Sequence, residues 1–306
     1  MKVIAIFGGT GFIGCELVKQ LHKMPVDKMP VEIRLFVRKK KFYELSHYLN
    51  RNQAHHRISL FGFTSGINLL DDLKGTDVII NLVGILHESR SIKFSMAHED
   101  YVTKLVDSAL KLKIKRMIHI SALGVNKAPS SKYLNSKYNA ELILKEKFKR
   151  YDWTIFRPSI VFGPRDKFIN LFKKMVRFLP LIFLISPKAE FQPIHVDDLV
   201  DIMIKSIDDK KTYKKVFNLG GPKKFTFYEI IKLITICDKK RNIVIGLNKT
   251  MSYLFVRLLQ LSPIKIITTD NLKSMETSNT VKVNDAYNFK SSLKELPTYL
   301  INYKQH

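Results

Sequence analysis

The 306-residue chain contains 52 Lys and Arg against 27 Asp and Glu, a formal charge of +25, and 45% of its residues are hydrophobic. This composition predicts a globular protein with a large core and favours anionic partners such as nucleotides, nucleic acids or acidic lipid surfaces. The basic residues are spread along the whole chain, with no recognisable nucleic-acid module and no basic stripe interleaved with aromatics. We therefore expect no specific nucleic-acid binding.

Cysteine usage and apolar run length limit the class of protein further. Cys15 and Cys237 are too few for a disulfide framework or a metal site, which indicates a reducing compartment. The longest apolar run, near residues 178–185, is far shorter than a bilayer span, so we expect no transmembrane helix. A strand expected from Lys2 leaves no room for a targeting peptide in the chain as given, and a cytoplasmic location follows as an expectation.

The first half of the chain alternates apolar runs of strand length with stretches of helical periodicity. Strands are expected at 2–7, 31–37, 57–63, 77–84, 116–122 and 153–162, with helices at 11–21, 98–112 and 133–148. Parallel strands need crossover helices to return the chain, so this order predicts an α/β protein with a doubly wound parallel sheet of the Rossmann type.

The pattern loosens after about Pro164. Strand-like pieces are expected at 191–196 and 215–219, and helices near residues 200, 228 and 254. We expect a dinucleotide-binding domain over 1–164 and a smaller α/β subdomain of substrate-binding type over 165–306, with some of its elements returning to the Rossmann core.

A glycine-rich loop follows the first strand. It consists of Gly8, Gly9, Thr10, Gly11, Phe12, Ile13 and Gly14. Glycine at these spacings lets the chain turn sharply, brings backbone N–H groups close to a pyrophosphate, and packs the helix against the sheet. The loop lies between a buried strand and a helix, so we expect it to bind a dinucleotide at the helix N-terminus.

The end of the second expected strand bears on which dinucleotide binds. An acid at this place would grip the ribose hydroxyls of NAD(H), but the strand ends in Arg38, Lys39 and Lys40. The guanidinium of Arg38 is suited to pairing with a 2′-phosphate, which favours NADP(H) and leaves NAD(H) as the alternative. The competing interpretation is that these three basic side chains are simply solvated.

Tyr133 and Lys137 are four residues apart on an expected helix and therefore share one face. In dehydrogenase chemistry such a tyrosine exchanges a proton with a carbonyl or alcohol, and the ammonium lowers the tyrosine pKa. Tyr228 and Lys232 repeat the spacing by chance. Position separates the two pairs, because Tyr133 follows the fifth expected strand, which ends near Ser121 at the ligand-binding edge of an open α/β sheet.

Together these residues resemble the short-chain dehydrogenase/reductase superfamily in its extended form. More specifically they are similar to the atypical branch that includes the nucleotide-binding accessory subunit of respiratory complex I (alpha subcomplex subunit 9) and its bacterial relatives. The similarity lies in the stretches 81–86, 119–124, 157–163, 166–172, 191–198 and 269–272. It implies cofactor contacts at Leu82, Val83, Gly84, Pro158, Tyr133 and Lys137 in addition to the glycine loop.

The resemblance also implies a cofactor-retaining protein with an incomplete catalytic set. The superfamily's serine aligns with either Ser121 or Ala122, and its helical asparagine is replaced by His98. The leading hypothesis is an NADP(H)-binding accessory or assembly factor of the respiratory NADH:quinone oxidoreductase, peripheral at the inner membrane. The alternative is an active NADP(H)-dependent reductase or epimerase on a lipid-like, quinone-like or nucleotide-sugar substrate that uses Tyr133.

Two other features carry weaker signals. Residues 168–187 interleave Lys and Arg with large apolar side chains, which suits a lid, a membrane-surface face, a subunit contact or a segment packed over a substrate cleft. His195, Asp197 and Asp198 are adjacent acidic and imidazole groups, but neighbours along a strand point in different directions. We expect no metal there, and expect Asp197 or Asp198 to cap a helix beginning near Leu199.

Overall fold

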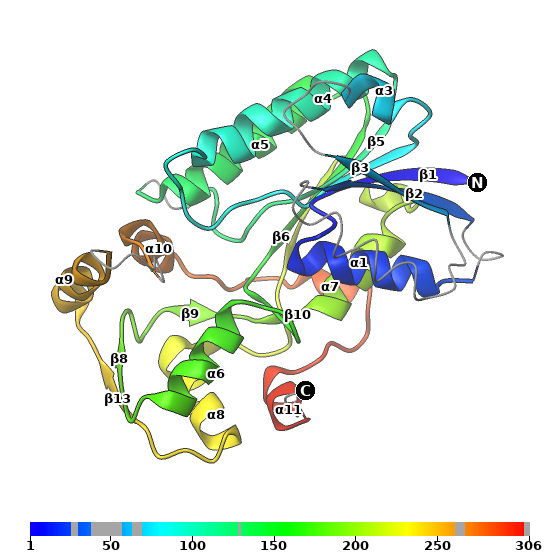
Figure 1. The fold of residues 1–306 in the computed structure, drawn as a ribbon. Coiled ribbons are helices and arrows are strands. Elements are labelled where there is room, and N and C mark those ends of the chain that lie inside the picture. Colours follow the sequence, from blue (N-terminus) through cyan, green and yellow to red (C-terminus); the bar gives the residue numbers. More distant parts are fainter. Residues whose placement is uncertain (26–29, 38–56, 63–68, 128–129, 261–266, 303–306) are drawn as a thin grey trace. The chain divides into compact units, whose positions relative to one another are not determined.

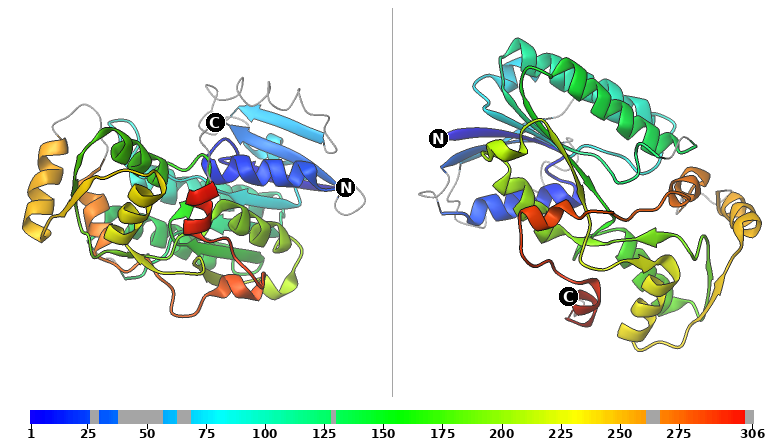
Figure 2. Two further views of the ribbon diagram at one scale, coloured as in Figure 1. Left: turned by 90° about the horizontal axis from the view of Figure 1, so that it is seen from below. Right: turned by 180° about the vertical axis from the view of Figure 1, so that it is seen from behind.

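The computed structural model describes residues 1–25, 30–37, 57–62, 69–127, 130–260 and 267–302. The chain folds into two compact units, and neither is continuous in sequence (Figures 1 and 2). Unit 1 comprises 1–121, 139–156 and 200–217, and unit 2 comprises 122–138, 157–199 and 218–306.

A seven-stranded sheet with the order β11-β6-β5-β4-β1-β2-β3 organises unit 1. The registered pairs of neighbouring strands from β3 to β6 are all parallel. These strands are β1 (Lys2–Phe7), β2 (Val31–Val37), β3 (Arg57–Gly62), β4 (Val78–Asn81), β5 (Arg116–Ile120), β6 (Asp152–Pro158) and β11 (Lys215–Leu219). The doubly wound parallel sheet predicted from the sequence is confirmed.

Helices cover both faces of this sheet (Figures 1 and 2). They are α1 (Phe12–Lys23), α3 (Leu69–Leu73), the π-helical turn η1 (Met96–Asp100), α4 (Tyr101–Lys111), α5 (Lys132–Lys147), α7 (Val196–Lys205) and the 3-10 turn η2 (Lys210–Thr212). Large side chains such as Phe7, Leu105 and Phe148 are completely buried on the face covered by α4 and α5. Strands that are covered on both faces have continuous apolar runs in the sequence, so the strands of this unit are predictable from the sequence.

The strand order reverses at β1, which makes it the topological switch point of the sheet. β1 pairs with β2 on one side and with β4 on the other, so the connections leave its carboxyl end in opposite directions. In open α/β sheets ligands bind at this topological switch point, outside the carboxyl ends of the strands. The glycine loop follows β1 directly and therefore lies at this point.

Unit 2 has its own core and several small strand pairs. Its elements are β7 (Val161–Phe162), α6 (Phe168–Phe178), β8 (Leu181–Leu184), β9 (Glu190–Phe191), β10 (Ile194–His195), β12 (Phe225–Thr226), α8 (Phe227–Cys237), β13 (Ile243–Gly246), α9 (Lys249–Gln260), α10 (Thr269–Met275), the 3-10 turn η3 (Asp285–Asn288) and α11 (Leu296–Asn302). The core contains an aromatic cluster in which the rings of Phe168, Phe172 and Phe227 contact one another. No helix in the described part of the chain is both long and apolar enough to cross a membrane.

Several element boundaries differ from the sequence prediction. The strand expected over 153–162 is interrupted after Pro158 and resumes as β7, and the strand expected over 191–196 is two short strands, after which α7 begins at Val196. Tertiary hydrogen bonds explain the first break, because Ser159 and Ile160 both bond to Asn279. A contact 120 residues away leaves no local sequence signal.

Candidate functional site

Close backbone packing requires glycine in the loop after β1. Gly8 has a positive φ of 83°, and a Cβ there would lie 3.1 Å from the carbonyl carbon of Leu82. A Cβ on Gly14 would lie 2.3 Å from the Gly8 carbonyl oxygen, so the turn and the first helix could not close. The loop also bonds to itself, since the Gly11 amide donates to the Gly8 oxygen at 2.9 Å. These contacts bring the glycine loop against the segment that follows β4.

The first helix begins without a cap of its own. Gly11 occupies the N-cap position of α1, no side-chain hydrogen bond caps the helix, and its first turn contains no acidic residue. The unpaired N–H groups and the helix dipole at such an end attract an anion. The backbone amides of Phe12 and Ile13 therefore begin a cradle that suits a diphosphate and that a Cβ on Gly14 would destroy.

Two buried side chains fix the segment after β4, which contains the expected contact residues Leu82, Val83 and Gly84. The Asn81 Oδ1 atom accepts from the Val83 amide at 3.0 Å, and its Nδ2 atom lies 3.1 Å from Nδ1 of His119. Because Asn81 Nδ2 donates, the His119 proton resides on Nε2. Further along, the Ile85 amide donates to Nε2 of His98 at 3.1 Å.

His98 therefore has a structural task in unit 1. It is 1% exposed, lies in the π-helical turn before α4, and stacks on Phe94. Accepting the Ile85 amide requires a neutral ring with its proton on Nδ1. This contact holds the segment after β4 in place, and nothing in the sequence pattern distinguished it from a simple loss of the superfamily's asparagine.

Ser121 lies at the carboxyl end of the sheet, just beyond β5. Its amide donates to the Phe156 carbonyl at 2.8 Å, which aligns it with β6. The side chain is 4% exposed, and its Oγ atom has no hydrogen-bond partner among the described residues. A buried hydroxyl costs free energy unless it is paired, so this atom is suited to a ligand group. Arg38, expected to select the dinucleotide, lies outside the described residues.

Unit 2 carries the expected Tyr133 and Lys137 on the first two turns of α5. Tyr133 packs in a small apolar cluster with Ala122, Val125 and Leu134, and burial raises the pKa of Tyr133 to about 12. A phenol with this pKa is protonated at neutral pH, which disfavours the base role of the tyrosine and leaves the acid role open. The Lys137 side chain is itself buried.

The N-terminus of α5 is closed by a carboxylate that sequence reasoning did not assign. Asp270, in the first turn of α10, accepts from the amides of Lys132 and Tyr133 at 2.7 and 3.1 Å and from the Ser131 hydroxyl at 3.2 Å. It thereby fixes the start of the helix that presents Tyr133. The only sequence signal was the resemblance around 269–272, because the contact spans more than 130 residues.

The remaining expected residues in unit 2 hold its backbone together. Pro158 accepts from the Leu123 amide at 3.0 Å through its carbonyl oxygen. Asp198 does not cap α7, which begins earlier than expected, at Val196. Instead Asp198 accepts from the Lys290 ammonium and the Lys294 amide, both at 2.7 Å, which corrects the predicted capping role.

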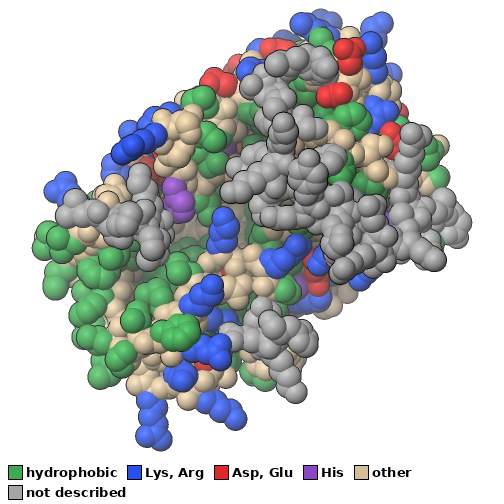
Figure 3. All heavy atoms as spheres, viewed as in Figure 1, with side chains coloured by type: hydrophobic (Ala, Val, Ile, Leu, Met, Phe, Trp, Pro, Cys, Tyr) green, Lys and Arg blue, Asp and Glu red, His purple; other side chains and the backbone are tan. Residues whose placement is uncertain are grey.

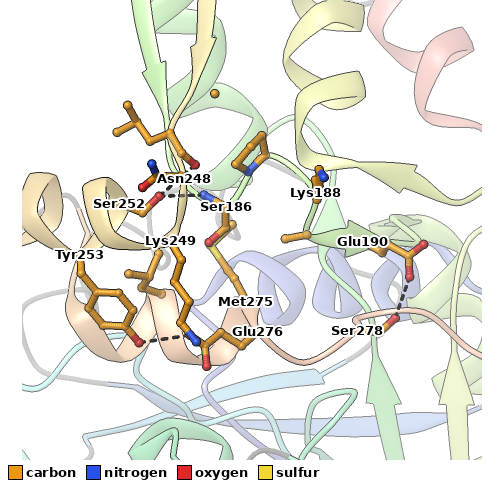
Figure 4. A pocket seen from close by; sticks show the side chains of 15 residues that line it. Ser186, Lys188, Glu190, Asn248, Lys249, Ser252, Tyr253, Met275, Glu276 and Ser278 are labelled. Carbon is orange, nitrogen blue, oxygen red and sulfur yellow. Dashed lines mark hydrogen bonds and ion pairs between the residues drawn. The ribbon is translucent and has the colours of Figure 1, made fainter.

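A cavity of about 930 Å³ lies within unit 2 (Figure 4). It is bounded by the loop after β8, the start of α9 and the end of α10. Lys249 pairs with Glu276 at 3.0 Å, and the Tyr253 hydroxyl donates to the same carboxylate at 3.3 Å. The hydrogen bond to Glu276 raises the pKa of the Lys249 ammonium, which keeps it protonated. These groups suit binding and orientation of a polar molecule better than proton transfer.

The parallel sheet, its switch point and the glycine cradle define a Rossmann-type nucleotide-binding protein. The chain belongs to the NAD dependent epimerase/dehydratase family, whose sequence profile matches residues 4–220. This finding confirms the resemblance identified from the sequence.

Similar proteins of two kinds were found. NADH dehydrogenase [ubiquinone] 1 alpha subcomplex subunit 9, mitochondrial, of Arabidopsis thaliana is 29% identical over 76% of this chain, and its counterpart in Dictyostelium discoideum is 26% identical over 84%. The matched stretches span 57% and 70% of those two proteins. The solved structure of MoeE5 in complex with UDP-glucose and NAD has a TM-score of 0.72 at 14% identity, covering 98% of this chain and 96% of that one, which shows a shared fold.

Proposed function

We propose that this protein binds a nicotinamide dinucleotide, with NADP(H) favoured, and serves as an accessory or assembly factor of the respiratory NADH:quinone oxidoreductase. The observation that carries the proposal is the open start of α1 beside glycines that tolerate no Cβ. Membership in a family described as NAD dependent supports the dinucleotide, and Arg38, which follows Val37 in the sequence, supports its 2′-phosphate.

Different residues of unit 1 would bind different parts of the cofactor. The amides at the start of α1 bind the diphosphate, and Asn81 and His98 keep the segment around Val83 against it. Ser121 offers its buried hydroxyl to the nicotinamide side. When bound, a nicotinamide dinucleotide would supply hydride chemistry. The raised pKa of Tyr133 keeps its phenol protonated at neutral pH, so it is poorly suited to act as a base there. In the accessory role the cofactor stabilises the native state.

The association with the respiratory enzyme is supported by the relatives named as subunits of NADH dehydrogenase. Deleting the gene in its own host and measuring assembled NADH:quinone oxidoreductase tests it. We expect the assembled enzyme to fall and to recover with the wild-type gene, and expect the tagged protein to copurify with it. An unchanged enzyme content after deletion would contradict the proposal.

The second candidate is an NADP(H)-dependent reductase or epimerase on a lipid-like, quinone-like or nucleotide-sugar substrate. It is favoured by Tyr133 and Lys137 on adjacent turns of α5 and by the cavity of unit 2, whose mainly apolar lining carries a few polar groups. Hydride transfer measured over a panel of carbonyl substrates separates the two candidates. Turnover abolished by Tyr133→Phe with cofactor binding retained would establish this second activity.

A further inference from the structure

Two strands in unit 2 expose apolar side chains on the face that normally points to water. β8 and β13 form an isolated parallel pair in which Leu181 lies opposite Ile243 and Phe183 opposite Ile245. These four side chains are exposed, whereas their neighbours Ile182 and Leu184 are buried in the core of unit 2. Parallel strands normally have both faces covered, so the outer face of this pair lacks a cover in the isolated chain.

The same exposed surface continues onto α9. The rings of Phe183 and Phe255 lie 5.9 Å apart, which places the helix beside the outer face of β8. α9 buries Ser252 and Val256 and directs Met251, Leu254 and Leu258 outward, with Leu254 61% exposed. Outward side chains at i, i+3 and i+7 form one stripe of a helix, and here that stripe is apolar.

The end of α6 completes the surface. The Asn242 side-chain amide donates to the Val176 carbonyl at 2.8 Å, which holds the end of α6 next to the start of β13. Phe178 is there 74% exposed, and Ile243 is 65% exposed. We call the outward side chains of β8, β13 and α9, with Phe178, the apolar face. Figure 3 shows hydrophobic side chains gathered over the part of unit 2 that carries these elements.

Basic residues dominate the segments that carry the apolar face. The described segments 167–189 and 239–260 contain ten Lys and Arg and no Asp or Glu. Two of the ten are paired with acids from outside these segments, Lys173 with Asp238 and Lys249 with Glu276. Arg177 directly precedes Phe178, and exposed Lys239, Lys240 and Arg241 directly precede β13. Long basic side chains next to apolar ones are suited to lie along a lipid interface with their charges among headgroups.

We propose that the apolar face of unit 2 binds the surface of an anionic lipid bilayer. The exposed aliphatic and aromatic side chains enter the interface, and the surrounding Lys and Arg contact anionic headgroups. A bilayer fits this combination because large exposed apolar side chains and long basic side chains lie side by side, and its apolar interior and anionic headgroups meet both over one continuous surface. This surface is separate from the cradle of unit 1 and does not depend on the cofactor.

Vesicle flotation of the full chain tests the proposal. With vesicles of phosphatidylcholine mixed with phosphatidylglycerol, the protein should float, and high salt should weaken the association because it screens the charges. With vesicles of phosphatidylcholine alone, most of the protein should remain free. Absence of flotation with the anionic vesicles, or equal binding to both kinds, would overturn the proposal.

Matched variants assign the effect to this surface. Phe178→Ser with Leu254→Ser, and Lys240→Glu with Arg241→Glu, should each lower vesicle partitioning at least tenfold with the melting temperature retained. The controls are Val283→Ser with Ile301→Ser, which are equally exposed in unit 2, and Lys210→Glu with Lys211→Glu on η2. These controls should bind within twofold of wild type.

Two results would overturn the assignment. The first is that the controls lose as much binding as the variants of the apolar face. The second is that the lipid-free protein is a dimer which Phe178→Ser with Leu254→Ser dissociates, because a second copy would then cover the face.

Discussion

The helices of this protein begin in two different ways. Four helix starts in unit 2 are closed by the chain's own side chains. Asp270 accepts from the Lys132 amide at the start of α5, and Asp166 accepts from the Ile169 amide at the start of α6. Thr226 and Thr268 begin α8 and α10 with reciprocal capping boxes. In unit 1, α1 begins at Gly11 with no side-chain cap.

This difference between capped and uncapped helix starts indicates where an external anion would bind. A closed start satisfies its N–H groups internally and contributes to stability, whereas an open start leaves that task to water or a ligand. The turn η1 also begins without a side-chain cap, at Ser95, but the open start of α1 is flanked by glycines that tolerate no Cβ. We therefore attribute its form to binding, and the closed starts to folding.

The largest effect is expected when the start of α1 is given a side-chain cap. Gly11→Asp supplies a carboxylate cap at a residue whose φ of −72° any amino acid adopts. The new charge repels a diphosphate by about 4 kcal/mol at a separation of about 4 Å. We expect dinucleotide affinity to fall at least about 100-fold in calorimetry, with the melting temperature retained.

The neutral variant Gly11→Asn is the matched control for that change. It caps the helix without adding charge, and its Cβ, like that of the Asp variant, would lie 3.1 Å from the Gly8 carbonyl oxygen. It should keep most of the affinity. Equal loss in both variants would attribute the effect to side-chain bulk instead of charge.

The closed start of α6 predicts a pH dependence of stability. Burial raises the pKa of Asp166 to about 6 from 3.8, despite the amides that favour its ionised form. Because the folded pKa is raised, the native state gains from the protonated acid below pH 4 and loses this gain as the pH rises through 6. The stability of wild type relative to Asp166→Asn should therefore fall by up to about 3 kcal/mol from pH 4 to 7 in urea unfolding. A difference that does not change with pH would contradict this cause.

A smaller effect is expected at the segment after β4. Asn81→Ala removes the acceptor of the partly buried Val83 amide, which costs roughly 1 kcal/mol of stability. Because the loosened segment lies against Gly8, dinucleotide affinity should fall by about tenfold. His98→Ala should act on the same segment from Ile85, so the double variant should show non-additive losses. Strict additivity would indicate that the two contacts act independently.

The smallest effect is expected at Tyr133. The amides at the start of its helix are already bonded to Asp270, and burial raises the pKa of the Tyr133 phenol to about 12. Tyr133→Phe should leave dinucleotide affinity and complementation of a deletion strain unchanged. In an absorbance titration, Tyr133 should remain protonated beyond pH 11, which the difference spectrum between wild type and variant reports. A phenolate at neutral pH would favour the catalytic alternative.

Sequence reasoning succeeded where structure is local. Runs of apolar residues indicate the buried strands, and the spacing of glycines indicates the loop. The order of strands and helices in unit 1 was therefore predictable from residues 2–14 onward. It failed where a contact joins distant segments. Three hydrogen bonds, from Asp270 to the start of α5, from Asn279 to Ser159 and from Lys294 to Asp198, join residues more than 90 positions apart. The first determines a helix start and the second a strand boundary, and the third gives Asp198 a role other than the predicted cap. The apolar face likewise was seen only as an ambiguous stretch at 168–187, because its second half comes from β13 and α9.

Native mass spectrometry of gently purified protein tests the account most directly, because it weighs the folded chain with whatever it retains. We predict one nicotinamide dinucleotide per chain in wild type, more readily retained as NADP(H) than as NAD(H), and none in Gly11→Asp. A folded wild-type chain that carries no dinucleotide and takes up neither NADP(H) nor NAD(H), oxidised or reduced, would contradict it.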